Sequence, residues 1–141
     1  MARTYERIII IHSLDHARAA LAAAAALDVP VTIASAPGAA AYLGPQWLSE
    51  VATLAAAEHP DARVSVLLDC GDAPGHVLAA LRQGIKRIRF TGRAAVAGKL
   101  AALAKRQGAE LIRGRRKALD LLDSPDPAAA CHRWLAGRSA A

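Results

Sequence analysis

Residues suited to chemistry follow the apolar runs of the sequence. Asp69 and Cys70 come directly after the run 63–68, and His12 comes after the run 7–11. Such runs are typical of buried parallel strands, and ligands bind at the carboxyl ends of those strands. A carboxylate can carry a proton, and cysteine and histidine are zinc ligands. Asp69 is therefore a candidate catalytic residue, and Cys70 and His12 are candidate metal ligands.

Whether these three side chains meet depends on the order of the strands. In a barrel-like order the second strand separates the first strand from the third, whereas in a flavodoxin-like order those two strands are neighbours. A purely structural role is the alternative. In that case Asp69 binds loop amides, Cys70 is a small buried apolar side chain, and Asp72 caps a helix.

A second set of residues could bind an anion. The loop 35–38 contains a glycine but lacks the phosphate-binding patterns GxGxxG and GxxxxGK[ST]. Residues 91–93 begin a predicted helix, whose free amides and Arg93 could hold an anion, although Thr91 could equally cap that helix. Alternation in the strand 86–90 predicts an arginine-bearing face that is open to water or to anions. The candidate substrate-binding residues are Ser35, Gly38, Thr91, Gly92, Arg93, Arg87 and Arg89.

The chain alternates five predicted strands with helices. The strands are expected at 7–11, 29–34, 63–68, 86–90 and 109–113, and the last helix follows a turn at 124–127. This alternation implies parallel pairing through right-handed crossovers. The predicted fold class is α/β, a five-stranded parallel sheet of βα units in either a half-barrel or an open doubly wound (Rossmann-like or flavodoxin-like) form.

The length of 141 residues predicts one domain, with βα units over 7–114 and a helical tail over 115–141. A closed eight-stranded barrel typically needs about 250 residues, so one copy of this chain is not expected to close one. Two copies could place half-barrels face to face. A homodimer is therefore predicted.

Composition limits the expected partners. Residues 1–81 carry four basic and eight acidic groups (net −4), whereas residues 82–141 carry 14 basic and four acidic groups (net +10). The chain has only five aromatic residues and no stacking platform, so nucleic acid is not the expected partner. No run is long enough for a signal peptide or a membrane span, and the two cysteines form no CxxC motif. We expect a cytoplasmic protein with free thiols and no membrane association.

Four stretches of the chain carry a family resemblance. HSLDHARA at 12–19 is similar to the pattern Asn-Asn-Leu-Glu-Gln-Ala-x-Ala, and PVTIASAPGAAAY at 30–42 is similar to Pro-Val-Ile-x-x-Ser…Gly-Ala…Tyr. HPDARVSVLLDCGD at 59–72 is similar to Pro-x-x-x-Val-x-x-His-Leu-Asp-His-Gly, and GIKRIRFTG at 84–92 to Gly-Phe-x-Ser-Val-Met-Ile-Asp-Gly. In their order and spacing these stretches resemble the N-terminal half of class II fructose-bisphosphate aldolases, a metal-dependent (βα)₈ family.

The resemblance implies which residues would do the chemistry of that family. Its acid/base is the Asp of Leu-Asp-His, which Asp69 matches, and its next residue is a metal-binding His, where this chain has Cys70. The later metal ligands and the phosphate-binding loops of the family have no counterpart in the sequence. A catalytic zinc needs three protein ligands and an open position, so the resemblance supplies too few ligands.

We therefore expect an aldolase-like protein that has lost aldolase activity and binds a protein partner or an anionic small molecule, such as a phosphorylated one, without a cofactor. The alternative is a metal-dependent lyase acting on a phosphorylated sugar or ketone. In that alternative Asp69 is the acid/base, and Cys70 and His12 hold zinc or another divalent metal.

Overall fold

Six parallel strands form one open sheet in the order β5-β4-β3-β2-β1-β6. The structure, a computed structural model, describes residues 6–137. The strands are β1 (Ile8–Ile10), β2 (Val31–Ala34), β3 (Val64–Asp69), β4 (Arg87–Arg89), β5 (Glu110–Ile112) and β6 (Ala118–Asp120). Consecutive strands from β1 to β5 are neighbours, as they are in a barrel.

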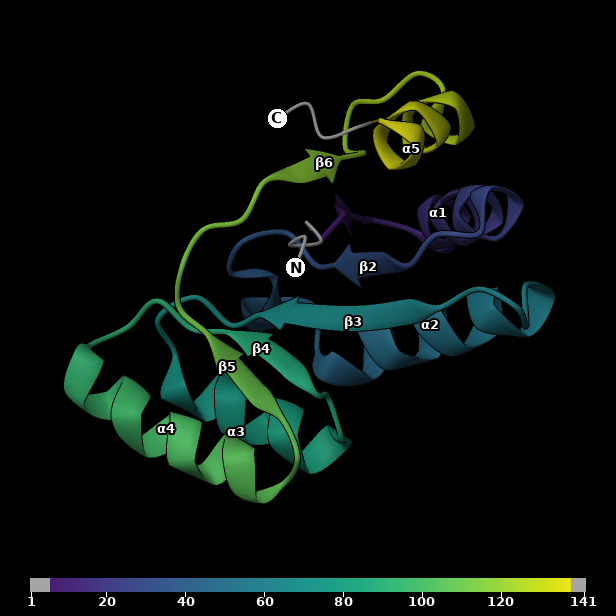
Figure 1. Cartoon of the computed structure of the whole chain (residues 1–141). Helices are drawn as coiled ribbons and strands as arrows, with labels where there is room; N and C mark the ends of the chain where they lie inside the picture. The colour runs from purple at the N-terminus through teal and green to yellow at the C-terminus, as the bar shows by residue number, and fades with distance from the viewer. Residues whose placement is uncertain (1–5, 138–141) are drawn as a thin grey trace, which may run out of the picture.

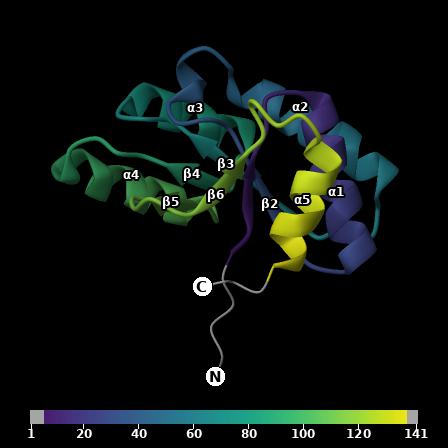
Figure 2. The same ribbon diagram turned by 90° about the horizontal axis from the view of Figure 1, so that it is seen from above.

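Five helices cover one face of this sheet (Figures 1 and 2). They are α1 (Leu14–Leu27), α2 (Pro45–Glu58), α3 (Pro74–Gln83), α4 (Ala94–Arg106) and α5 (Pro127–Ala136), with a short 3₁₀ helix, η1 (Ala39–Ala41), before α2. Neighbouring helices pack in the order α5-α1-α2-α3-α4, which follows the order of the strands. The predicted α/β class is confirmed in its half-barrel form, because a doubly wound sheet would have helices on both faces.

The strand count differs from the prediction. All five predicted strands form, but β6 lies in the segment 115–141 that was expected to be a helical tail. β6 pairs with β1 on the side away from β2, with Ile9 opposite Leu119. The last strand of a closed barrel would pair there, so the open gap of this sheet lies between β5 and β6.

A basic segment of five residues, Arg113–Lys117, connects β5 to β6 without a helix. We call this segment the basic strap. It runs between the two edges of the open sheet (Figure 1), because β5 and β6 are the terminal strands of the sheet order.

Side chains alternate between two cores. Ile9, Ile33, Leu68 and Ile88 point toward the helices and are fully buried in the main core. Side chains on the other, concave face of the sheet form a second cluster. It consists of Ile8, Ala34, Leu67 and Ile112, with Ile10 and Ala118 packed against it. We call this concave face the lumen face.

Helix caps set the loops at the carboxyl ends of the strands. The hydroxyl of Ser13 accepts the His16 amide and caps α1. The predicted caps Asp72 and Thr91 are wrong, because α3 has Ala73 at its N-cap and α4 has Arg93, neither with a side-chain cap. Both helices begin from extended backbone instead.

Within residues 6–137, no helix is long and apolar enough to cross a membrane.

The return of β6 to the sheet can be tested at two adjacent leucines. Leu121 is fully buried and its amide donates to Ile10, whereas Leu122 is 60% exposed. Leu121→Ala is expected to lower the free energy of unfolding by about 2–5 kcal/mol, because it leaves a cavity in the core. The matched variant Leu122→Ala should change it by less than about 0.5 kcal/mol. Urea unfolding measures both, and equal effects would place β6 outside the core.

Candidate ligand site on the lumen face

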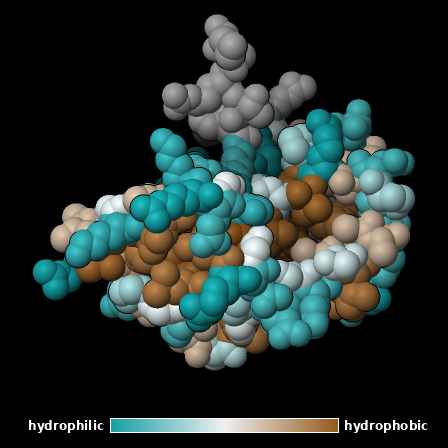
Figure 3. All heavy atoms as spheres, turned by 90° about the horizontal axis from the view of Figure 1, so that it is seen from below, coloured by the Kyte–Doolittle hydropathy of each residue, from teal (hydrophilic) through white to brown (hydrophobic). Residues whose placement is uncertain are grey.

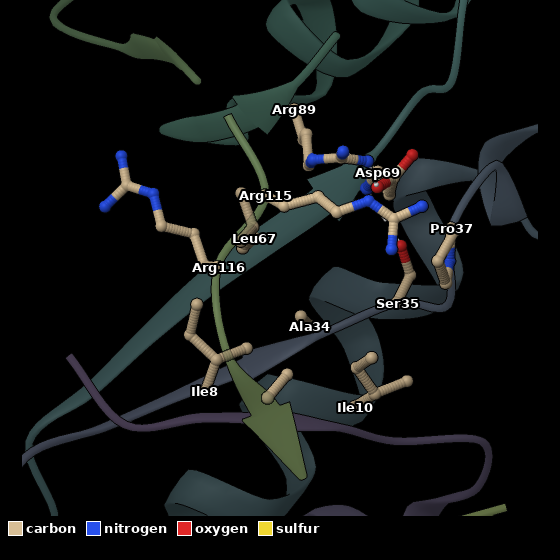
Figure 4. Close-up of a pocket in the computed structure, with 11 residues that line it drawn as sticks. Ile8, Ile10, Ala34, Ser35, Pro37, Leu67, Asp69, Arg89, Arg115 and Arg116 are labelled. Carbon is tan, nitrogen blue, oxygen red and sulfur yellow. Dashed lines mark hydrogen bonds and ion pairs between the residues drawn. The ribbon is translucent and has the colours of Figure 1, made fainter. Parts of the chain in front are cut away.

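A cavity of about 230 Å³ opens on the lumen face beneath the basic strap (Figure 4). Its walls come from β1, β2, β3, β4 and β6 and from the strap. The lining residues are Ile8, Ile10, Ala34, Ser35, Pro37, Leu67, Asp69, Arg89, Arg115, Arg116 and Ala118. Ser35, Asp69 and Arg89 lie at the carboxyl ends of β2, β3 and β4, where ligands of parallel sheets bind, whereas Arg116 lies near Glu6 at the other end of the strands.

Asp69 holds the loops around this cavity together. Its Oδ1 accepts the amides of Gly38 (2.8 Å) and Gly71 (2.9 Å), and its Oδ2 accepts Arg89 Nη1 (2.7 Å). Gly38 and Gly71 both adopt positive φ, a conformation that glycine reaches without steric cost. The Asp69 side chain is 8% exposed. Its carboxylate therefore joins the loops after β2 and β3 to strand β4.

The arginines of β4 both point to the lumen face and both have acidic partners. Arg89 pairs with Asp69 and also donates to the Gly114 carbonyl of the basic strap at 3.2 Å. Arg87 lies at the opposite end of the strand and donates to both oxygens of the Glu6 carboxylate. Hydrogen bonding from Arg87 is the main reason that the pKa of Glu6 lies below its usual value, against the opposing effect of burial. These two predicted anion-binding residues are thus committed to groups of the chain itself.

The strap supplies the cations that remain available. Arg116 Nη1 lies 3.9 Å from Glu6, whose carboxylate already binds Arg87. Arg115 has no hydrogen bond or ion pair with any other residue in the range 6–137. Its side chain extends over the cavity toward Ser35 and Asp69 (Figure 4).

The predicted metal set does not assemble. β2 lies between β1 and β3, so His12 and Asp69 are separated by a strand. Instead, His12 Nε2 lies 2.7 Å from Asp120 Oδ1 at the end of β6. Burial alone would raise the pKa of Asp120, but hydrogen bonds from His12 and the Leu122 amide lower it.

Cys70 is also unsuited to bind a metal here. The side chain is 2% exposed, and burial raises the pKa of its thiol to about 12. The side chain packs in the main core and not in the lumen-face cluster. Residues 6–137 contain no group of three or more His, Cys, Asp and Glu side chains that could hold a metal ion. The side chains at this site therefore do not fit the divalent metal that the family resemblance implies.

The remaining predicted residues divide into two groups. Ser35 lines the cavity, and its hydroxyl accepts the Asp69 amide at 2.9 Å, while Gly38 contributes the amide already described. Thr91 and Arg93 are exposed and do not line the cavity. Gly92 lies against the Phe90 ring, where an added Cβ would come within 2.4 Å of Phe90 Cζ. Glycine at this position therefore serves packing in the structure.

Three residues of this region were not predicted from the sequence as part of a site. Arg115 was expected only to share with Arg113 a strand face open to water or to anions, Arg116 was visible only as part of the basic C-terminal half, and Asp120 lay in the presumed tail. The density of charge in RGRRK at 113–117 was the available signal. It gave no indication that the segment lies over the lumen face.

Comparison with known proteins agrees with this half-barrel geometry. The family model described as "Fructose-bisphosphate aldolase class-II" matches residues 7–94, which is more than half of the chain. A crystal structure of a "putative fructose-1,6-biphosphate aldolase" from Coccidioides immitis matches with a TM-score of 0.64 at 17% sequence identity. The match covers 77% of this chain and 40% of that one. No curated protein matches the sequence.

The fold defines an incomplete parallel α/β barrel, with Ser35, Asp69 and Arg89 at the carboxyl ends of the strands. The family model then gives the ancestry: the chain belongs to the class II fructose-bisphosphate aldolase family. It spans less than half the length of the solved structure that it matches.

The role of Asp69 can be tested with a charge-removing variant. Asp69→Asn is expected to lower the free energy of unfolding by roughly 2–4 kcal/mol, because it leaves the largely buried Arg89 without its counter-charge. Asp72→Asn is the control, since Asp72 is exposed and lies three residues after the end of β3. Its effect should stay within about 0.5 kcal/mol. Chemical denaturation compares them, and an Asp69→Asn protein as stable as the control would contradict the proposed network.

Proposed function

We propose that the chain is an aldolase-like protein that has lost aldolase activity and binds an anionic small molecule in the lumen cavity. The observation that carries this proposal is Arg115, which extends over the cavity without a partner in the range 6–137. A guanidinium in a partly enclosed site binds carboxylate or phosphate groups through paired hydrogen bonds. Arg89 adds no free charge, because Asp69 neutralises it.

The loss of catalysis is inferred from the residues at the matched positions. Asp69 corresponds to the acid/base of the family, but both of its oxygens are already hydrogen-bonded to the chain. Cys70 stands where the family has a metal-binding His, and its thiol stays protonated near neutral pH. A general base must reach the proton that it removes, and a metal must keep enough ligands to stay bound. Neither requirement is met by these two side chains as they lie.

The proposed loss of activity is tested by metal content and turnover. Protein purified without chelators should hold less than about a tenth of an equivalent of zinc. It should also fail to cleave fructose bisphosphate or tagatose bisphosphate when zinc is added, since a catalytic zinc needs about three protein ligands. Metal analysis and a coupled cleavage assay measure the two. Zinc-dependent cleavage above the buffer blank would establish the metal-dependent lyase instead.

Anion binding is tested by amide chemical shifts in a titration with inorganic phosphate and with acetate. Shifts should concentrate at residues 35–38 and 113–118, which surround the cavity. Arg115→Gln should weaken binding by roughly tenfold, the loss expected for one charge-assisted hydrogen-bonding group. Arg82→Gln, an exposed charge-matched control on α3, should bind like the wild type. Shifts scattered over the surface, or equal binding by both variants, would contradict the proposal.

A homodimer and a cytoplasmic location remain predictions. Apolar residues gather over the outer side of α3 and α4 (Figure 3), where Leu78, Ala101 and Ala102 are exposed. This surface lies on the helix side of the sheet, so self-association through it would differ from the predicted pairing of two half-barrels face to face. Light scattering at tens of micromolar gives the mass, and a monomer at that concentration would count against the dimer. Two buried free cysteines, Cys70 and Cys131, are compatible with a reducing compartment.

A further inference from the structure

The wall of the lumen cavity is apolar where a ligand would lie. Ile8, Ala34 and Leu67 belong to the buried lumen-face cluster, and Ile10 and Ala118 pack against it. All five line the cavity, and none has a side-chain hydroxyl or amide. The body of a bound molecule would therefore contact hydrocarbon on β1, β2, β3 and β6.

The polar groups of the cavity offer few free hydrogen-bonding positions. Asp69 binds two amides and Arg89, and the Ser35 oxygen accepts the Asp69 amide. In Figure 4 these side chains lie together at one end of the cavity, with the isoleucines and Ala34 at the other. A polyhydroxylated ligand would lose its hydrogen bonds to water on binding, and the apolar wall cannot replace them. By contrast, each buried methylene group is worth roughly fourfold in affinity.

The free charge fits a single anionic group. Arg115 is unpartnered within residues 6–137, and Arg89 is bound to Asp69. Arg116 lies 3.9 Å from Glu6 and points away from Arg115, so the two strap arginines do not converge on one group (Figure 4). Arg115 therefore provides one guanidinium, whose planar fork matches one carboxylate or one phosphate. The volume of about 230 Å³ lies below the roughly 300–1,000 Å³ typical of drug-sized ligands, so the ligand is small.

From these observations we propose that the lumen cavity binds a small acid that has one anionic group, held by Arg115, and an apolar rather than a polyhydroxylated body. This inference rests on the proposed function, because it takes the same cavity as an anion site. It adds the chemical class of the ligand. The carboxylate and the phosphate monoester share the recognising chemistry, and the experiment separates them.

The experiment compares probes that are matched in length and differ in hydroxylation. Hexanoate and gluconate are six-carbon carboxylates, and butyl phosphate and erythritol phosphate are four-carbon phosphate monoesters. Each is titrated into the full chain, with the amides of residues 35–38 and 113–118 as reporters of the cavity. We expect hexanoate to bind at least tenfold more tightly than gluconate, and butyl phosphate more tightly than erythritol phosphate. The tighter of hexanoate and butyl phosphate identifies the preferred head group.

Two variants, each with a matched control, test whether binding depends on Arg115 and on the apolar wall of the cavity. Arg115→Gln should weaken hexanoate binding about tenfold, and Arg82→Gln should leave it unchanged. Ala118→Ser adds one hydroxyl to the wall and should reduce the preference for hexanoate over gluconate, whereas Ala129→Ser on α5, outside the cavity, should not.

The outcomes separate this inference from the proposed function. If gluconate binds as tightly as hexanoate at the same amides, the apolar-body inference is overturned while anion binding stands. If Arg115→Gln binds hexanoate as tightly as the wild type does, the inference that Arg115 holds the anionic group is overturned. If no probe shifts the cavity amides, the proposed function itself fails, and the inference fails with it.

Discussion

Charge on the concave face is the constraint on which this structure depends. A parallel sheet covered by helices normally buries apolar side chains on both faces. Here β3 and β4 place Asp69, Arg87 and Arg89 on the lumen face, where unpaired charge would be costly. The chain neutralises this charge in two layers, Glu6 with Arg87 at one end and Asp69 with Arg89 at the other. Between the layers lies the apolar cluster that forms the wall of the cavity.

The basic strap and β6 follow from the open form of the sheet. Five strands in barrel order leave the outer side of β1 without a partner, and β6 fills it. The strap must then pass from one sheet edge to the other, which brings its arginines to the lumen face. Arg89 holds the strap through the Gly114 carbonyl, so the same arginine links the strap to Asp69 and to the loops after β2 and β3.

The sequence was sufficient for the features that depend on local pattern. The β-branched and leucine-rich runs predicted β1 to β3, because strands buried on both faces read as continuous apolar segments. β4 and β5 were predicted from shorter segments that alternate apolar and charged residues between two helical patterns. β6 was missed because Ala118–Asp120 is short, has no β-branched residue and follows a run of charges. The local sequence pattern also could not predict contacts between residues that lie far apart in the sequence. Arg87 meets Glu6 81 residues away, and His12 meets Asp120 108 residues away.

Family membership and present chemistry are separate conclusions for this chain. The strand order and the loop motifs indicate family membership, because they belong to the fold and to the core that the fold buries. Catalysis needs more, namely a base with a free oxygen and ligands that converge on one point. Asp69 is kept at its family position, but its carboxylate is used to join three elements of the sheet. Asp69 therefore has structural bonds in this chain that are sufficient to account for a carboxylate at this position, and a match at that position is not by itself a sign of turnover.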